Sequence, residues 1–119
     1  MLVDTSVWID HFRRPNHDLE YMLGEGLVLT HPFVIGEIAC GSLSRRTHVL
    51  ELLGALPTAL VATSEEAHAL VERHRLFGTG LGWIDIHLLA SAKLGNQSLW
   101  SADRRLRETA LKLGLAGPE

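Results

Sequence analysis

Short apolar runs alternate with longer amphipathic runs along the chain, and this alternation predicts an α/β fold. Four short apolar stretches, each followed by a helix-start signal, are expected to be β-strands: residues 2–4, 27–30, 59–62 and 98–101. Strands that alternate with helices form parallel sheets that helices cover on both faces. We therefore expect a three-layer α/β/α sandwich with a central, mainly parallel sheet.

Three of the expected helices have recognisable ends. Pro32 suits the first turn of a helix over residues 32–41, because the N–H that proline lacks is unpaired there in any case. Ser64 is expected to cap the next helix through its side-chain oxygen. A later helix, with apolar residues in one stripe over 84–92, is expected to end at Gly95 and Asn96, which tolerate a left-handed backbone.

Length and composition limit the classes of protein to which the chain can belong. A chain of 119 residues predicts one domain over residues 1–119. Its 46% hydrophobic and 21% charged residues, with a net charge of −3, exclude general disorder and a protein that coats nucleic acid by overall positive charge. No apolar run approaches the roughly 20 residues of a membrane span, and no signal peptide is visible.

Cysteine usage points to a reducing compartment. Cys40 is the only cysteine, which excludes an internal disulfide and a cysteine-based zinc site. We expect Cys40 to be a small buried residue and the protein to be cytoplasmic, with no membrane association.

Two acidic residues follow predicted strands. Asp4 stands at the carboxyl end of the first strand, and Asp103 stands just beyond the fourth. Ligands of open α/β sheets collect in the crevice beyond these strand ends. Each acid has an alternative interpretation as a helix cap, which needs no ligand.

Two further acids lie on predicted helices, on or next to apolar faces. Glu37 is adjacent to Ile38 on the helix predicted over residues 32–41 and lies on or next to its apolar face. Asp85 begins the apolar stripe of a later helix. Unpaired carboxylates rarely occupy such positions, because burying a charge is costly. The alternative is an ion pair, which Arg45 or Arg46 would provide for Glu37.

Several carboxylates in one crevice require a cation. Two like charges about 5 Å apart repel by roughly 3 kcal/mol at an effective dielectric constant near 20. Ligands that are all oxygen select a hard divalent ion, Mg²⁺ or Mn²⁺, over zinc. Such an ion suits the hydrolysis of a phosphate ester.

The four acids lie in segments that resemble a known family. The segments are LVDTSVWI at residues 2–9, VIGEI at 34–38, WIDIHLLASA at 83–92 and LWSAD at 99–103. Together, in this order and spacing, they resemble the PIN domain, and specifically the VapC-type toxins of toxin–antitoxin pairs. The resemblance covers essentially the whole chain, residues 1–119.

This resemblance implies a function, a metal site and partners. It implies a Mg²⁺-dependent endoribonuclease (Mn²⁺ being the other candidate ion) that cuts cellular RNA. It implies a VapB-type antitoxin and a homodimer. The metal ligands that it implies are Asp4, Glu37, Asp85 and Asp103, and it places Ser6 beside the first acid as a supporting or water-holding group.

One position departs from the family pattern. The family often has a further acid two residues after the fourth one, where this chain has Arg105. The departure favours a single metal ion over two. The basic residues of the last helix have two interpretations: they hold an RNA backbone, or they form a solvated face paired with Glu108. These residues are Arg104, Arg105, Arg107 and Lys112.

Three other features of the sequence bear on the candidate site. Trp8 and Trp83 either pack in the core or in a dimer interface, or stack on bases. The glycine-rich segment at residues 78–82 is expected to be a connector, since no strand precedes it as a phosphate loop would require. His87 is expected outside the metal shell, because positions two apart do not share a helix face with Asp85.

Two other functions remain open on the sequence alone. In the first, Asp4 is the nucleophile of a phosphatase or phospho-acceptor domain, although such enzymes would favour an acid where Ser6 stands. In the second, the chain is a catalytically weak PIN-like binding module. The intact series of four acids favours the nuclease over both.

Overall fold

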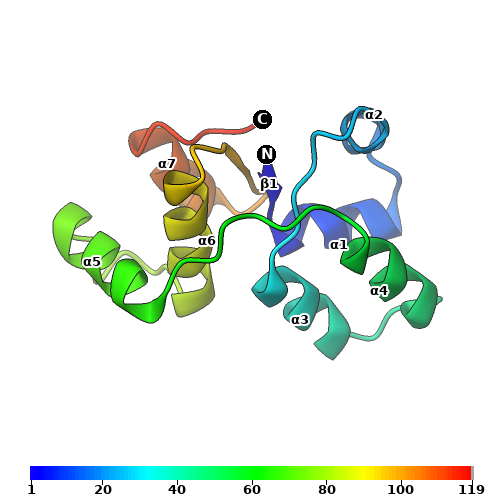
Figure 1. Ribbon diagram of the computed structural model, residues 1–119, viewed down its shortest axis with the longest axis horizontal. Helices are drawn as coiled ribbons and strands as arrows, with labels where there is room; N and C mark the ends of the chain where they lie inside the picture. The colour runs from blue at the N-terminus through cyan, green and yellow to red at the C-terminus, as the bar shows by residue number, and fades with distance from the viewer. Residues whose placement is uncertain (119) are drawn as a thin grey trace.

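The computed structural model of this protein describes residues 1–118, and residue 119, the last of the predicted domain, lies outside the described part. The elements in chain order are β1 (Leu2–Val3), α1 (Thr5–Arg13), α2 (His17–Gly24), α3 (Pro32–Cys40), α4 (Arg46–Gly54), α5 (Ser64–His74), α6 (Trp83–Leu94), β2 (Leu99–Trp100) and α7 (Arg104–Lys112). Figure 1 shows α5 and α7 on the opposite side of β1 from α2 and α4.

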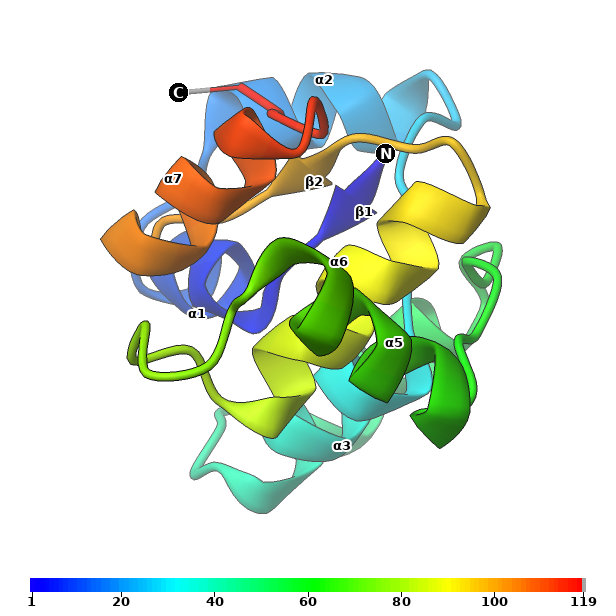
Figure 2. The same cartoon turned by 90° about the vertical axis from the view of Figure 1, so that its left-hand side faces the viewer.

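The sheet is parallel but short. β1 pairs with β2 in parallel, with Leu2 opposite Leu99 and Val3 opposite Trp100, and the two strands lie side by side in Figure 2. Isolated parallel bridges extend this order on both sides, at residues 2 and 29, 30 and 58, and 99 and 116. The predicted α/β class is confirmed, whereas a three-layer sandwich is not established by a sheet of two two-residue strands.

Two predicted strands are wrong in extent. Residues 27–30 contribute only the bridges at positions 29 and 30, and residues 59–62 contribute none, because the bridge lies one residue earlier at Thr58. The apolar residues that suggested these strands are divided between core and surface: Val28 and Ala59 are buried, whereas Leu27 is 52% exposed and Leu60 is 61% exposed. The runs of apolar residues therefore predicted longer strands than the structure contains.

The helix ends agree with the sequence in part. Pro32 begins α3, as predicted. The cap of α5 is Thr63 and not Ser64: the Thr63 hydroxyl accepts from the Glu66 N–H, and the Glu66 side chain accepts from the Thr63 N–H, which is a capping box. After α6, Asn96 is left-handed at φ 52°, whereas Gly95 is not.

Two helices were not predicted. Helix α2 buries only Leu19, and α4 buries only Leu53. A helix with one fully buried residue has a weak periodic signal, so its apolar stripe is hard to distinguish from a loop.

Helix α6 is the central helix of the core. Its residues 86–92 are all buried, and it packs against both α5 and β2. Trp8 of α1 is only 4% exposed and stacks on Phe12, which confirms the core interpretation for this tryptophan. Cys40 is exposed at the end of α3, so the expectation of a buried cysteine is wrong. None of the helices in residues 1–118 is long and apolar enough to cross a bilayer.

Candidate active site

Asp4 lies at the carboxyl end of β1 and caps α1. Its Oδ2 accepts hydrogen bonds from the Ser6 hydroxyl at 2.6 Å, the Ser101 hydroxyl at 2.9 Å and the Ser6 N–H at 3.4 Å. The residue is 6% exposed. A carboxylate this buried is tolerated because three donors replace the water that it loses. The capping interpretation is thus right, and the same oxygen also belongs to a network of hydroxyl groups.

This hydroxyl network joins the ends of the two strands. The Ser6 Oγ accepts from the Ala102 N–H at 2.9 Å, and the Ser101 Oγ accepts from the Asp103 N–H at 3.0 Å. Asp103 in turn caps α7, since its Oδ1 accepts from the Leu106 N–H at 3.0 Å. Asp4 and Asp103 therefore lie at the same edge of the sheet, as the strand ends predict. Ser101, to which the sequence analysis gave no role, is recognisable as the hydroxyl residue that directly follows β2.

Glu37 reaches the same region from α3. Its Oε1 accepts a hydrogen bond from the Thr5 hydroxyl at 2.8 Å, which links α3 to the first residue of α1. Of the two positions expected for Glu37, on or next to the buried face, the structure has the second: Glu37 is exposed, and its neighbour Ile38 is buried. The arginine alternative is wrong: the Arg46 guanidinium donates to the Ala39 carbonyl at 3.0 and 3.2 Å.

Asp85 is a half-buried carboxylate close enough to the other three for their charges to act on it. It lies in the first turn of α6, where its Oδ2 accepts from the Gly82 N–H at 3.0 Å. Burial raises the pKa of Asp85, the Gly82 hydrogen bond partly opposes this, and the negative charges of Asp4, Asp103 and Glu37 raise the pKa further. All the charges that act on Asp85 have its own sign.

The donor chemistry fits a hard divalent cation. Four carboxylates supply only oxygen ligands, which Mg²⁺ and Mn²⁺ prefer. Within residues 1–118, the ion pairs shorter than 4.0 Å are His17–Glu20 and Arg104–Glu108, so no cationic side chain pairs with any of the four acids. The same part of the chain holds no group of three acidic, histidine or cysteine side chains already gathered around one point. The four acids therefore influence one another through their charges, but three or more of them are not gathered around one point in the described residues.

One basic residue of α7 has the partner that the solvated-face interpretation requires. The Arg104 Nε donates to the Glu108 Oε1 at 2.9 Å, and this hydrogen bond and the arginine charge lower the pKa of Glu108. The pair is exposed and follows the i,i+4 spacing of a helix surface.

The aromatic residues near Asp85 differ in burial. Trp83 is 42% exposed, so it is not a core residue, and its ring contacts His68 at a centroid distance of 4.6 Å. His87 is buried between Trp83 and Phe33, with centroid distances of 4.7 and 4.9 Å. Trp83 thus presents an aromatic surface beside the start of α6.

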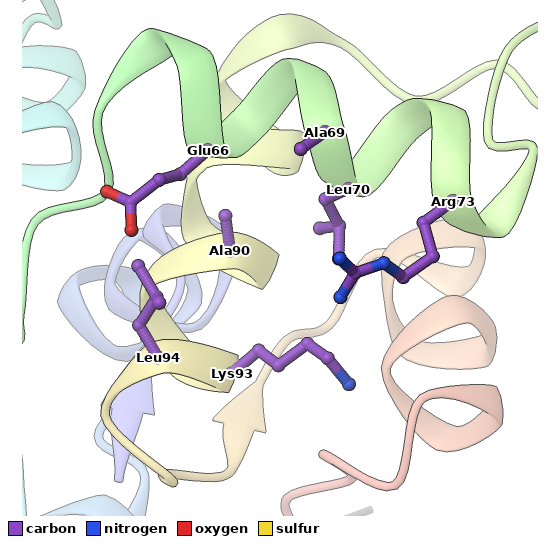
Figure 3. Close-up of a pocket in the computed structure, with 7 residues that line it drawn as sticks. All are labelled: Glu66, Ala69, Leu70, Arg73, Ala90, Lys93 and Leu94. Atoms are coloured by element: carbon purple, nitrogen blue, oxygen red, sulfur yellow. The ribbon is translucent and has the colours of Figure 1, made fainter.

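Among the hollows of the surface formed by residues 1–118, one has a member of the four acids in its wall. A hollow of about 420 Å³ has Glu37 in its wall. Figure 3 shows another, of about 250 Å³, where Arg73 of α5 and Lys93 of α6 lie at one end and Glu66 at the other. Because none of the four acids lines the second hollow, it is not part of the candidate site.

Comparisons with known proteins place these features in context. A family model described as the PIN domain matches residues 1–112. Two curated relatives are each 44% identical to this chain over 117 residues. Both are named Ribonuclease VapC32, and they come from two different strains of Mycobacterium tuberculosis. That alignment covers 98% of this chain and 94% of each relative.

Proposed function

This chain belongs to the PIN-domain family, and from this premise we propose that it is a metal-dependent endoribonuclease and the toxin of a VapBC-type toxin–antitoxin pair. The reaction is hydrolysis of phosphodiester bonds in cellular RNA. The observation that carries the proposal is that the charges of Asp4, Glu37 and Asp103 all act on Asp85, while no cationic side chain of residues 1–118 pairs with any of the four.

The four carboxylates are the proposed metal ligands: Asp4, Glu37, Asp85 and Asp103. Mg²⁺ is the proposed ion, with Mn²⁺ as the other candidate, because all the donors are oxygen. The chemistry that such an ion supplies when bound is neutralisation of charge at the phosphodiester and activation of water.

Several neighbours hold the carboxylates in place. The hydroxyls of Ser6 and Ser101 orient Asp4, and the Thr5 hydroxyl orients Glu37. The Gly82 N–H orients Asp85. Ser6 is proposed as a positioning residue, because its oxygen already donates to Asp4 and accepts from the Ala102 N–H.

The proposal extends to the whole protein. We place the protein in the cytoplasm as one domain that is inhibited by a VapB-type antitoxin and forms a homodimer. We also propose that the segments joined by parallel bridges at residues 29–30, 58 and 116 complete the sheet of a three-layer α/β/α arrangement. The parallel sense of every bridge supports this extension.

The phosphatase alternative is less well supported. A nucleophilic carboxylate must approach phosphorus, whereas Asp4 is 6% exposed and its Oδ2 accepts three hydrogen bonds. Treatment with acetyl phosphate followed by mass spectrometry should show no phosphorylated Asp4. An adduct on this residue would favour the alternative.

The test of the nuclease is Asp4→Asn, which keeps an acceptor oxygen for the two serine hydroxyls. Cleavage of purified ribosomal and transfer RNA with Mg²⁺ should fall at least about 100-fold, because charge stabilisation by the metal is worth several kcal/mol. The matched control is Asp10→Asn, an exposed acid on the same helix, which should cleave as the parent does. Parent-like cleavage by Asp4→Asn would contradict the proposal. Absence of cleavage by the parent itself would also contradict it and would favour the binding-module alternative.

A further inference from the structure

The side chain of Arg105 crosses from α7 to the loop that precedes α6. Arg105 is the second residue of α7, and its guanidinium lies against the backbone of Gly80. A Cβ atom placed on Gly80 would lie 2.5 Å from the Arg105 Nη1 and 2.9 Å from its Cζ. The guanidinium therefore occupies space that is open only because residue 80 has no side chain.

The loop offers an internal comparison for this contact. Gly78 and Gly80 both have positive φ, at 71° and 85°, a conformation that favours glycine. A Cβ on Gly78 would meet nothing within 4 Å. The two glycines thus share a backbone requirement, but only Gly80 also makes room for Arg105.

The location of Arg105 relates it to the four acids. It follows Asp103 by two residues on α7. The loop against which it lies leads, two residues after Gly80, to Gly82, whose N–H holds Asp85. The guanidinium therefore lies between the helix that Asp103 caps and the loop whose Gly82 N–H holds Asp85.

The charge of Arg105 has no partner within the described chain. No carboxylate of residues 1–118 lies within 4.0 Å of it, and its guanidinium donates no hydrogen bond to another residue in that range. The adjacent Arg104, by contrast, is paired with Glu108. Arg105 is exposed, so an external anion can reach it.

We propose that Arg105, seated over Gly80, binds a phosphate of the RNA backbone and holds the strand beside the four carboxylates. A guanidinium presents two parallel N–H groups to a phosphate, which gives orientation as well as charge. An arginine at this position anchors the substrate, whereas an acid would add a fifth negative charge. The inference rests on the proposed function, since it names a substrate contact of that same site.

The first test measures RNA binding separately from cleavage. In an Asp4→Asn background, the affinity for a mixed transfer RNA preparation is measured between 50 and 200 mM salt for Arg105→Ala, Arg105→Lys and Arg104→Ala. Arg105→Ala should bind about tenfold more weakly, as expected for loss of a charged hydrogen-bonded contact, and its slope of log affinity against log salt should fall by about 1. Arg105→Lys should keep the slope and recover part of the affinity, and Arg104→Ala should lose less than Arg105→Ala.

The second test displaces Arg105 without changing it. In Gly80→Ala the new Cβ forces the flexible end of the arginine away, whereas Gly78→Ala imposes a similar backbone strain and leaves the arginine in place. Both variants should show a similar drop in melting temperature. Only Gly80→Ala should weaken RNA binding, and it should add nothing further in the presence of Arg105→Ala.

The outcomes separate this inference from the function on which it rests. If the parent cleaves RNA and Arg105→Ala keeps parental affinity and salt slope, the phosphate contact is wrong. If Arg105→Ala weakens RNA binding but Gly80→Ala and Gly78→Ala have the same RNA affinity, the packing of Arg105 against Gly80 does not position it for RNA. If the parent neither binds nor cleaves RNA with Mg²⁺ or Mn²⁺, the proposed function fails and this inference fails with it.

Discussion

Asp4 is both a helix cap and a buried carboxylate. As a cap it satisfies the start of α1, and as an acceptor it ties the hydroxyls of Ser6 and Ser101 across the ends of both strands. Replacing it with alanine would remove the cap, at a cost of about 1 kcal/mol, and leave two hydroxyls without their acceptor. Asparagine is therefore the substitution that isolates the charge of Asp4 from its structural contacts.

Asp85 provides the clearest residue-scale prediction. Asp85→Asn removes one of four like charges and keeps an oxygen for the Gly82 N–H. In EDTA the variant should be as stable as the parent or more stable, by up to about 1 kcal/mol, because the repulsion is relieved. Added Mg²⁺ should raise the melting temperature of the parent, since a ligand that binds only the folded state stabilises it.

The same melting experiment supplies the control for Asp85→Asn. The variant should lose most of the Mg²⁺-dependent increase, whereas Asp10→Asn should keep it. Equal increases in the parent and Asp85→Asn would exclude Asp85 from the metal site.

At the scale of the element, helix starts depend on which oxygen reaches the first-turn amides. The Thr63 hydroxyl accepts from the Glu66 N–H at 3.1 Å, and the Glu66 Oε1 accepts from the Thr63 N–H at 2.9 Å. Ser64, one residue later, is already the first residue of α5. Both residues are good caps by type, so the choice between them depended on the path by which the chain enters the helix.

The capping box predicts a difference between two neighbouring substitutions. Thr63→Ala should lower the free energy of unfolding by about 1 kcal/mol, because a first-turn N–H loses its acceptor. Ser64→Ala should change it by less than about 0.5 kcal/mol, as for a surface substitution without such a role. Urea denaturation of both variants measures the difference. A larger loss for Ser64→Ala would mean that α5 begins one residue later than described.

On the scale of the whole molecule, His31 joins three segments of the core. Its Nδ1 accepts from the Phe33 N–H at the start of α3, and its Nε2 lies 3.1 Å from the Ser91 Oγ on α6. The Ser91 Oγ also accepts from the Ala62 N–H ahead of α5. Since Nδ1 is an acceptor, the neutral ring carries its proton on Nε2. His31 is fully buried, so a second proton would place a charge in the core.

This arrangement predicts that the protein loses stability in acid. Burial, followed by the charge of His87, lowers the pKa of His31 to about 4 from its ordinary 6.5. Between these values the unfolded chain binds the proton and the folded chain does not, so the free energy of unfolding falls as the pH drops through this window. The loss from His31 should be on the order of 2–3 kcal/mol between pH 6.5 and 4.

Chemical denaturation across that pH range measures the effect of His31. His31→Asn, which retains a capping oxygen for α3, should be less stable at pH 7 but show a flatter dependence on pH. The variant His17→Asn, at a fully exposed histidine, should keep the parental dependence. Parallel curves for His31→Asn and the parent would assign the acid sensitivity to other groups.

Features that depend on neighbours in the chain were predictable from the sequence. The alternation of apolar runs predicted the α/β class, Pro32 marked the start of α3, and the strand ends placed Asp4 and Asp103 at one edge. These features follow from local periodicity, cap chemistry and the rule that parallel strands end at the same side. The PIN-domain resemblance followed from the same short segments.

Only the tertiary structure decided which surfaces are covered and which distant atoms meet. Cys40 is exposed, Leu60 lies outside the sheet, and Glu37 bonds to Thr5 and not to an arginine. The Ser101–Asp4 bond spans 97 residues, and Arg105 found its place over Gly80 through the packing of α7 on a loop. Each of these outcomes depends on how whole elements pack against one another, and a periodic pattern within one segment carries no information about the surface that it will meet.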